Sequence, residues 1–416
     1  MKAIDRRQFG RIAVSGLAGL AALGPRGAES GPADQPDAAS GVSSSELPPG
    51  LRRKKEGDIY RRPLGRTGLW VSELSLGGSP SPALAVFLAA LERGVNYCDT
   101  SPRYARWKGE ESVGRAIRGR RDKICVATKC TPNRDGVVNT ADILQQVDGS
   151  LARLGTDYVE VLCVHRASTD KDLYSDWVLD AIDRLRRAGK ARFFGASVHN
   201  TSPEFIRRYI ESGHYQVLMI PFNVYFDPKL AKQGGMEAGA TAIDEALNLA
   251  AQKGIGVIVM KSLAAGRAAE APVPPGISPA QARIRWVLRR PEVSTILNEM
   301  TTFEYLKENL AASAADLSPA EESYLRRAVH QTSRSVCRMC LTCEQGCPAG
   351  LPIADLLRAR MYAMDYGDRP RARALAEQIN ARERLESCRG CGQCEASCPW
   401  GVHTGYLFDQ LRTIVA

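Results

Sequence analysis

The segment Asn96-Tyr-Cys-Asp-Thr-Ser-Pro-Arg-Tyr104, continued by Ala105-Arg-Trp-Lys-Gly-Glu-Glu-Ser-Val-Gly114, indicates how the chain is organised. The apolar run Val95–Cys98 predicts a short strand. A carboxylate, Asp99, ends this strand, and a phenol, Tyr104, stands on the loop after it. Barrel enzymes keep their reactive groups on the loops at the carboxyl ends of parallel strands. The segment therefore predicts a strand that delivers two ionisable groups to such a rim.

The rest of the chain repeats this pattern from Tyr60 onward, because short apolar runs alternate with longer helical patterns. The predicted strands are Leu74–Leu76, Val95–Cys98, Ile124–Thr128, Val159–Val164, Arg192–Ala196, Val217–Pro221, Val257–Met260 and Thr295–Leu297. The predicted helices between them include Thr140–Leu154, Trp177–Ala188, Pro203–Ser212 and Thr241–Lys253. This alternation is typical of the α/β class and of a closed (β/α)₈ TIM barrel. A doubly wound open sheet is the alternative, but no Gly-x-Gly-x-x-Gly follows the first strand.

Two later strands bring further ionisable groups to the same rim, since the third ends at Lys129 and the fourth at His165. A phenol has an ordinary pKa near 10, and a neighbouring ammonium lowers it by favouring the phenolate. Asp99 would hold the ammonium in place, and Tyr104 would donate a proton to a carbonyl oxygen that the imidazole orients. Each residue alone also has a structural interpretation, with Lys129 as a strand-end lysine whose ammonium reaches solvent and His165 as a hydrogen-bonded core histidine. Together they predict a catalytic group for hydride chemistry on a carbonyl.

The segment from about Tyr60 to Leu310 resembles the aldo-keto reductase family. The motifs that carry the resemblance are Tyr60-Arg-Arg-Pro-Leu-Gly-Arg-Thr-Gly-Leu69, Asp99-Thr-x-x-x-Tyr104, Gly109-Glu-Glu111, Thr128-Lys129, His165-Arg166, Gly195-Ala-Ser197 and Glu308-Asn309. The resemblance implies a catalytic tetrad made of Asp99, Tyr104, Lys129 and His165, with NADP or NAD as the hydride carrier. It also implies dinucleotide contacts, with the nicotinamide near Ser197, His199 or Asn200 and Gln216, the phosphates at the loop Lys261-Ser262-Leu-Ala-Ala-Gly266, and the adenine at Glu308 and Asn309.

Three positions depart from the family pattern. Glu299 stands where a glycine or a lysine is common, and Tyr305 stands where an arginine often lies near the adenosine 2′-phosphate. An acid in place of a base disfavours a 2′-phosphate by like-charge repulsion, so the choice between NADP and NAD stays open. Lys261 occupies a position where some branches stack an aromatic ring on the nicotinamide.

Eight of the twelve cysteines crowd into two C-terminal runs. The runs are Cys337-Arg-Met-Cys340-Leu-Thr-Cys343-Glu-Gln-Gly-Cys347-Pro348 and Cys388-Arg-Gly-Cys391-Gly-Gln-Cys394-Glu-Ala-Ser-Cys398-Pro399. Both have the C-x₂-C-x₂-C-x₃-C-P spacing of bacterial ferredoxins, in which the fourth cysteine ligates the other cluster. The spacing predicts two [4Fe–4S] clusters, one held by Cys337, Cys340, Cys343 and Cys398 and the other by Cys388, Cys391, Cys394 and Cys347. Zinc is the alternative, although zinc ligands come as separated pairs.

The other cysteines and the segments between the runs predict ordinary structure. The isolated cysteines lie on apolar runs and are expected in the barrel core: Cys98, Cys125, Cys130 and Cys163. Ile353–Asp365 and Arg371–Leu385 carry helical patterns, and Ser318–Arg327 predicts a helix that closes the barrel, capped by Asp316 or Ser318. The C-terminal domain is thus expected to be small, helical and ferredoxin-like.

The N-terminus predicts an export signal rather than a folded element. Arg6-Arg7-x-Phe9 precedes a mildly apolar segment, Ile12–Leu23, that is too short for a permanent membrane span. This pattern resembles a twin-arginine signal, which implies the twin-arginine export machinery as a partner and a periplasmic or otherwise exported protein, with the cytoplasm as the alternative. The expected domains are the signal (1–28), a disordered linker (29–57), the barrel (58–330) and the iron–sulfur domain (331–416).

Two functions remain open from the sequence. The first is an oxidoreductase that transfers hydride between NADP or NAD and a small carbonyl or alcohol substrate, with clusters that exchange electrons with a redox partner protein. The second is an exported iron–sulfur protein for electron transfer or partner docking that keeps the barrel as a non-catalytic scaffold. The net charge of +10 would suit a protein that binds nucleic acid. However, the basic residues alternate with acids and lack interleaved aromatics, so no nucleic-acid partner is expected.

Overall fold

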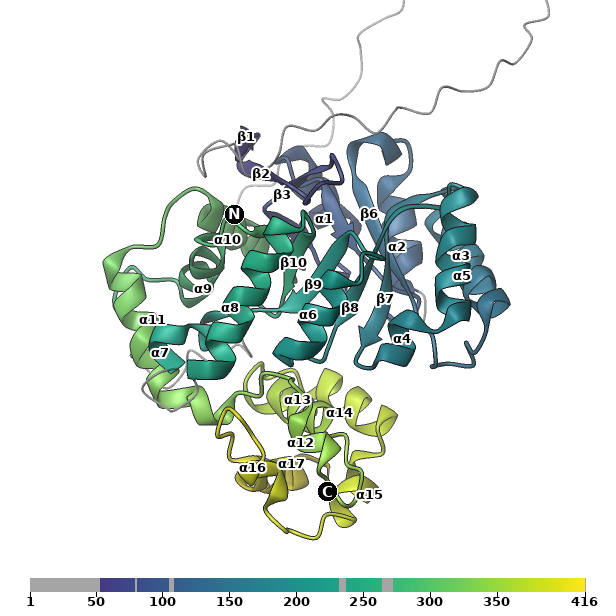
Figure 1. The fold of residues 1–416 in the computed structure, drawn as a ribbon. Helices are drawn as coiled ribbons and strands as arrows, with labels where there is room; N and C mark the ends of the chain where they lie inside the picture. The colour runs from purple at the N-terminus through teal and green to yellow at the C-terminus, as the bar shows by residue number, and fades with distance from the viewer. Residues whose placement is uncertain (1–52, 79–80, 105–107, 232–236, 264–271, 416) are drawn as a thin grey trace, which may run out of the picture. The chain divides into compact units, whose positions relative to one another are not determined.

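The computed structural model describes residues 53–78, 81–104, 108–231, 237–263 and 272–415. Within this part, eight parallel strands close into a barrel in which each strand pairs with the next along the chain and the last pairs with the first (Figure 1). The strands are β4 (Leu74–Leu76), β5 (Tyr97–Asp99), β6 (Cys125–Cys130), β7 (Val159–Ala167), β8 (Ala191–Val198), β9 (Val217–Pro221), β10 (Gly256–Met260) and β11 (Val293–Asn298). The predicted TIM barrel is therefore confirmed.

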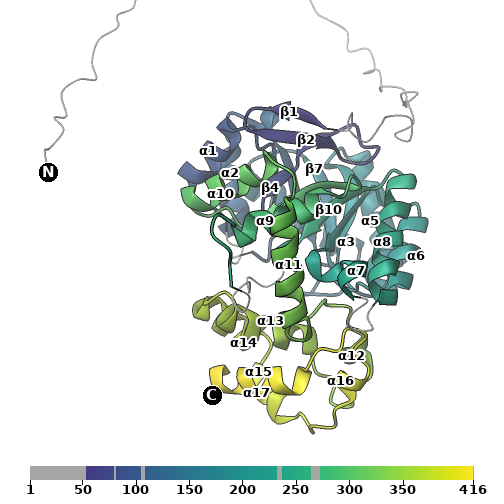
Figure 2. The same ribbon diagram turned by 90° about the vertical axis from the view of Figure 1, so that its left-hand side faces the viewer.

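Amphipathic helices cover the outside of the strands (Figure 2). They are α1 (Leu84–Glu92), α2 (Lys108–Ile117), α3 (Thr140–Leu154), α4 (Asp170–Tyr174), α5 (Asp176–Arg187), α6 (Pro203–Glu211), α7 (Pro228–Ala231), α8 (Glu237–Gln252), α9 (Pro279–Leu288), α10 (Phe303–Ser313) and α11 (Pro319–Thr332). Short 3₁₀ turns are η2 (Arg121–Lys123), η3 (Val224–Phe226) and η5 (Ser333–Ser335).

Helix α3 shows why the local sequence forms these helices. Asn139 and Asp142 cap its first turn reciprocally, and Gly155 ends it with a left-handed backbone at φ 65°. Its apolar residues recur at helical spacing and are buried against the barrel, as at Ile143 and Val147. The predicted bounds of this helix are confirmed.

A small antiparallel sheet closes the amino end of the barrel. Its strands are β1 (Lys54–Glu56), β2 (Ile59–Pro63) and β3 (Trp70–Ser72), in the order β1-β2-β3. Leu64 and Val71, from this part of the chain, are fully buried in the cluster that fills the barrel interior. The sequence analysis did not predict this sheet, and β1 forms inside the segment expected to be a linker. Residues 29–52 of that linker and the predicted signal lie outside the described residues.

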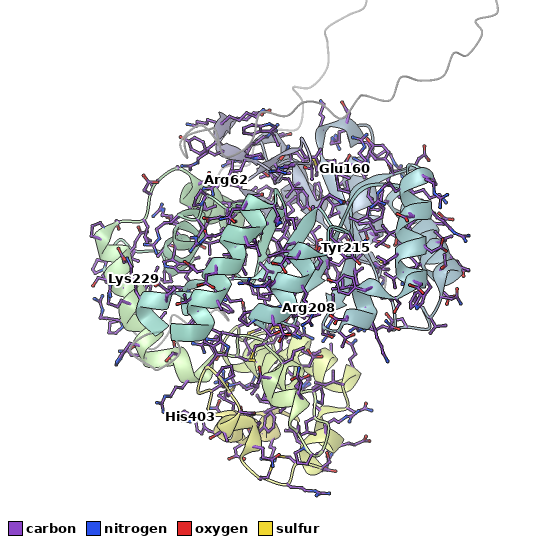
Figure 3. The ribbon with its side chains drawn as sticks, in the orientation of Figure 1. Arg62, Glu160, Arg208, Tyr215, Lys229 and His403 are labelled. Carbon is purple, nitrogen blue, oxygen red and sulfur yellow. The ribbon has the colours of Figure 1, made fainter. Side chains whose placement is uncertain are left out.

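Buried ion pairs fix the same end. Arg62 Nε lies 2.9 Å from Glu73 Oε2, and its other nitrogens donate to backbone carbonyls before and in β11. Arg121 similarly binds Glu160 at 2.8 Å. Figure 3 labels Arg62 and Glu160, and both lie toward the β1–β3 sheet. These charges are therefore structural, at the end of the barrel remote from the catalytic candidates.

The C-terminal region is helical, as predicted. Its helices are α12 (Thr342–Gln345), α13 (Ile353–Met364), α14 (Arg369–Gln378), α15 (Ala381–Glu386), α16 (Gln393–Ala396) and α17 (Thr404–Val415). One detail of the prediction is wrong, because Arg371–Leu385 is not a continuous helix. Asn380 adopts a left-handed backbone at φ 49° and separates α14 from α15. Ser318, one of the two predicted caps, starts α11 in a capping box with Glu321.

None of the helices in the described ranges is both long and apolar enough to cross a membrane. The isolated cysteines lie where they were expected, with Cys98, Cys130 and Cys163 buried in the barrel and Cys125 partly buried.

Candidate active site and cluster ligands

Three neighbouring strands bring the predicted catalytic groups to one rim. Asp99 ends β5, Lys129 lies near the end of β6, and His165 lies near the end of β7. The parallel register pairs Asp99 with Ala127 and Lys129 with Cys163, so all these side chains stand at the carboxyl end of the barrel. Tyr104 joins them from the loop after β5. The structure thus gathers the residues that the sequence analysis grouped.

Lys129 and Asp99 form a buried ion pair at the centre of this group. Lys129 is fully buried; its Nζ donates to Asp99 Oδ2 and, at 2.7 Å, to the carbonyl oxygen of Thr100. Burial lowers the pKa of Lys129, but the charges of Asp99 and Tyr104 raise it by more, so the amine stays protonated. Burial likewise raises the pKa of Asp99, and Lys129 opposes that rise. The other carboxylate oxygen of Asp99 has no hydrogen-bond partner within the described residues.

The ammonium also lies against the phenol. Lys129 Nζ is 4.7 Å from the centre of the Tyr104 ring. Burial raises the pKa of Tyr104 by more than the charge and hydrogen bond of Lys129 lower it. The expectation of a net lowered pKa is therefore wrong here, because the cost of burying a phenolate exceeds the attraction of the ammonium. A phenol that keeps its proton through neutral pH suits a proton donor.

His165 completes the rim group as a neutral imidazole. Its ring stands edge-on to Tyr104, with ring centres 5.7 Å apart and an interplanar angle of 85°. Ser101 Oγ lies 3.2 Å from Nδ1 of the same ring. Burial and the nearby cations Lys129 and Arg166 lower the pKa of His165 well below its ordinary value. A neutral imidazole at this place can donate one N–H to a carbonyl oxygen.

Two predicted nicotinamide contacts keep polar atoms without strong partners. Ser197 lies in β8 at the same rim, and among the described residues its hydroxyl has only the thioether sulfur of Met260, at 3.9 Å, as a weak acceptor. His199 is buried, and its Nδ1 has no partner in the described part of the chain. Such atoms fit the polar carboxamide of a bound nicotinamide.

The prediction that Gln216 contacts the nicotinamide is wrong. Gln216 precedes β9 and exchanges hydrogen bonds with the backbone of Phe194 at 2.8 and 3.1 Å, near the amino end of the strands. The β9 residue paired with Ser197 is Met219, three positions further on, or about 10 Å along a strand. The motif was therefore placed at the wrong end of β9, and the residue beside Ser197 offers no amide.

The other predicted dinucleotide contacts are engaged within the barrel. Ser262 donates to Asn298, which donates to Asn309, each at 2.7 Å, and Asn309 donates to the carbonyl of Tyr305 at 2.8 Å. Glu308 accepts a 2.6 Å bond from Ser278, the cap of α9.

Asn200 binds the carbonyl of Ser168 at 3.1 Å and caps the backbone of Ser202 at 3.0 Å. Gly266 lies outside the described residues. The rim thus fits the reacting end of a dinucleotide at Ser197, while the polar groups expected to hold its other end already bind one another.

The C-terminal region contributes to the rim, which sequence reasoning missed. Arg166, directly after His165, pairs with Asp355 of α13 at 2.6 Å, and Tyr362 of the same helix lies near enough to raise the pKa of Tyr104 slightly. Glu299 pairs with Arg371 of α14 at 2.8 Å. The acid that departs from the family pattern is therefore matched by a base from the cysteine-rich region. Spacing along the chain carries no signal for such non-local pairs.

Four of the predicted cluster ligands come together. Burial, followed by the charges of Cys340 and Cys398, raises the pKa of the Cys337 thiol to about 12. Burial and the charges of Cys337, Cys340 and Cys398 likewise raise the pKa of Cys343. Cys398, the last cysteine of the second run, thus lies near enough to Cys337 and Cys343 for its charge to act on both, which agrees with the crossed pattern of two-cluster ferredoxins.

The local backbone also suits sulfur ligands. Met339 N lies 3.3 Å from Cys337 Sγ, and Val402 N lies 3.4 Å from Cys398 Sγ, as hydrogen-bond donors that stabilise cluster thiolates. Among the described residues, no group of three or more His, Cys, Asp or Glu is arranged to hold one metal ion. A cubane spreads its ligands more widely, because each thiolate binds a different iron.

The second set of predicted ligands is less buried. Cys391 is exposed, and Cys347, Cys388 and Cys394 are partly buried. Helices α12 and α16, which belong to the two cysteine runs, contact each other. The four cysteines of the first set are all partly buried, so the two quartets differ at Cys391; the quartet that contains it is called the exposed one below, and the other the sheltered one.

Comparison with known proteins assigns both regions. Residues 68–275 match the model of the Aldo/keto reductase family. The chain belongs to the aldo/keto reductase family. Residues 336–403 of this aldo/keto reductase match a 4Fe-4S dicluster domain. The chain is 28% identical over 312 residues to the uncharacterized oxidoreductase YqkF of Bacillus subtilis. The alignment covers 67% of this chain and 100% of YqkF.

Solved structures of reductases share its fold. The aldo-keto reductase AKR11C1 from Bacillus halodurans, in a holo form, aligns with a TM-score of 0.53 at 24% identity over 65% of this chain and 96% of its own. An aldo/keto reductase from Klebsiella pneumoniae in complex with NADP and acetate aligns with a TM-score of 0.51 at 24% identity over 62% of this chain and 92% of its own.

Proposed function

We propose that this aldo/keto reductase transfers hydride between a nicotinamide dinucleotide and a carbonyl or alcohol substrate, with Tyr104 as the general acid. The observation that carries the proposal is the buried Lys129–Asp99 ion pair against the Tyr104 ring, beside a neutral His165. Nothing in the packing of a barrel requires four ionisable groups at one rim, and burying them is costly.

Each residue has a separate task in this scheme. Tyr104, protonated at neutral pH, gives its proton to the carbonyl oxygen of the substrate. Lys129 stabilises the phenolate that remains, and Asp99 keeps the ammonium charged and in place. The N–H of His165 directs the carbonyl oxygen toward Tyr104. A nicotinamide dinucleotide supplies the hydride when bound, and Ser197 would hold its carboxamide.

The choice between NADP and NAD depends on charge near Glu299. Its carboxylate alone would repel a 2′-phosphate, but Arg371 offsets that charge at 2.8 Å. We therefore propose that either dinucleotide can be used, and both are supplied separately in the test below.

We further propose that the two cysteine runs hold two [4Fe–4S] clusters. Cys337, Cys340, Cys343 and Cys398 would bind the sheltered cluster, and Cys388, Cys391, Cys394 and Cys347 the exposed one. A bound cluster carries one electron at a time. The exposure of Cys391 supports a redox partner protein that docks at the second cluster, because electron transfer needs close approach.

A second candidate function is an electron-transfer protein with a non-catalytic barrel. Met219 beside Ser197 favours it, because this position supplies no amide to a nicotinamide. The twin-arginine pattern supports an exported protein under either function, since this route carries folded proteins with their clusters in place. The export proposal is tested by fractionating cells that express the full chain and measuring how much of the protein is in each fraction. Recovery of the protein in the cytoplasmic fraction alone would contradict it.

The variant Tyr104→Phe separates the two functions. It removes one hydroxyl from the rim and should lower carbonyl reduction with NADPH or NADH by about 100-fold or more, the usual contribution of a general acid. Tyr158→Phe is the matched control, because Tyr158 precedes β7 at the other end of the barrel. Cluster absorbance should be the same in all three proteins.

Aldehyde reductions with purified, air-free protein provide the measurement. Turnover that survives Tyr104→Phe unchanged would remove the proposed role. No dinucleotide-dependent turnover in the unmodified protein, with clusters intact, would favour the electron-transfer function.

A further inference from the structure

A cavity lies between the carboxyl rim of the barrel and the cysteine-rich region. Asn223 and Lys261 line it from the loops after β9 and β10, and Arg358 lines it from α13. Cys337, a ligand of the proposed sheltered cluster, lines the same cavity. Most of the remaining lining is apolar. The two regions of the chain therefore build one site together.

Positive charge is in excess at this site. Asp355 pairs with Arg166 at 2.6 Å and with Arg358 at 3.0 Å, so one carboxylate is shared by two guanidinium groups. Lys261 adds a third basic group, and burial together with the charges of Arg358 and Arg166 lowers its pKa to about 7. Glu344 lies nearby, and its carboxylate, which accepts a 2.7 Å bond from the backbone of Ala354, counts against these charges. Arg338 also lines the cavity, so the basic side chains at the site still outnumber the carboxylates of Asp355 and Glu344.

Several donors at the site lack good acceptors. The only hydrogen-bond acceptor within reach of Lys261 Nζ in the described residues is the sulfur of Met260, at 3.8 Å. Arg358 Nε and His199 Nδ1 are buried and have no partner in the described ranges. Burial of unpaired donors is unfavourable, and a bound anion would satisfy them.

The backbone holds two of these cations in strained positions. Arg166 and Lys261 both have φ near 59°, a left-handed conformation that residues other than glycine rarely adopt. Arg166 also lies where the pairing of β7 with β8 becomes irregular. Strain of this kind at a strand end persists where a side chain must point in one direction, and it clusters at ligand sites.

We propose that Lys261, Arg358 and Arg166 form an anion subsite that binds the carboxylate of a small carbonyl substrate whose carbonyl lies at Tyr104. The inference rests on the proposed reductase function and names its substrate class, an aldehyde or ketone that carries a carboxylate. A phosphate of the dinucleotide offers the same chemistry, so the experiment distinguishes the two sources. Helix α13 supplies Arg358 to the cavity and also carries Tyr362, which lies near Tyr104.

A matched pair of aldehydes tests the carboxylate. 4-Oxobutanoate and butanal have four carbons each and differ in the charge at the far end. Full-length protein with its clusters should prefer 4-oxobutanoate, and Lys261→Met or Arg358→Met should lower kcat/KM for it by roughly 10- to 100-fold, the effect of one charge-assisted hydrogen bond. In Arg358→Met, which lies outside the expected dinucleotide contacts, turnover of butanal should change by less than about twofold. Arg382→Met, which removes an exposed pair with Glu386 on α15, is the control.

Binding is measured separately, so that a failure of turnover does not decide the matter. Titration calorimetry with succinate, inorganic phosphate and NADPH should show succinate binding that Lys261→Met and Arg358→Met both weaken. If these variants weaken NADPH binding and lower kcat/KM for both aldehydes by the same factor, the anion bound at the subsite is the dinucleotide phosphate. The carboxylate assignment is then overturned. Succinate binding without any turnover would support the subsite while refuting the reductase function. Unchanged binding of all three probes would overturn the subsite itself.

Discussion

The ion pair between Lys129 and Asp99 gives the sharpest test of the candidate site, because both side chains are almost completely buried, at 0% and 4% exposure. Asp99→Asn removes the carboxylate and leaves the ammonium with one further acceptor, the carbonyl of Thr100 at 2.7 Å. Lys129→Met leaves a buried carboxylate without a cation. Removal of one partner from such a pair costs about 3–5 kcal/mol of folding free energy.

The double variant Asp99→Asn/Lys129→Met should behave differently. It replaces both charges by neutral side chains of similar volume, and such replacements are often close to neutral. We expect its loss of stability to be smaller than the sum of the two single losses by about 2–3 kcal/mol, within the range of coupled neighbours. Each single variant should lower the barrel's thermal midpoint by about 6–20 °C, since about 1 kcal/mol shifts a domain of this size by 2–4 °C.

Circular dichroism of the full chain during heating provides the measurement, with cluster absorbance recorded beforehand to confirm that the cysteine-rich region is intact. Arg382→Gln serves as the control, because its exposed pair with Glu386 contributes under about 1 kcal/mol. Strictly additive losses, or a neutral Lys129→Met, would refute the idea that the two charges depend on each other.

The remaining predictions concern the clusters and the pH profile. Cys391→Ala should lose about half of the iron and sulfide, because each quartet is expected to hold one cluster; full iron retention would contradict the ligand assignment. Carbonyl reduction should stay level from about pH 6.5 to pH 10 and fall only above that, since the raised pKa of Tyr104 keeps the phenol protonated and the lowered pKa of His165 keeps the imidazole neutral. A falling limb between pH 7 and pH 9 would show that another group controls the reaction.

The barrel could be predicted from the sequence because its strands are short apolar runs that alternate with amphipathic helices. The grouping of the candidate catalytic residues followed from the same reasoning, since consecutive parallel strands end at one rim. Gln216 was assigned to the wrong end of β9 because the sequence of a five-residue strand does not reveal which of its residues pair with the neighbouring strands. That Ser197 pairs with Met219 could be established only from the structure.

Electrostatics and non-local contacts were beyond the sequence for a different reason. The residue types reveal that an ammonium lies near a phenol, but not how deeply Tyr104 is buried, and burial decides the sign of its pKa shift. The contact of α13 with the rim joins residues almost two hundred positions apart, as in the bond from Arg166 to Asp355. No local pattern reports such a contact.

The sealed amino end of the barrel has a consequence for how molecules reach Tyr104. Leu64 and Val71 fill that end, so solutes must arrive from the opposite side, past helices α13 and α14. Two ion pairs join the rim to these helices: Arg166 with Asp355 of α13, and Glu299 with Arg371 of α14. Both pairs are partly exposed. Dissolved salt weakens such bridges. Binding and release of reactants at this rim should therefore depend on ionic strength.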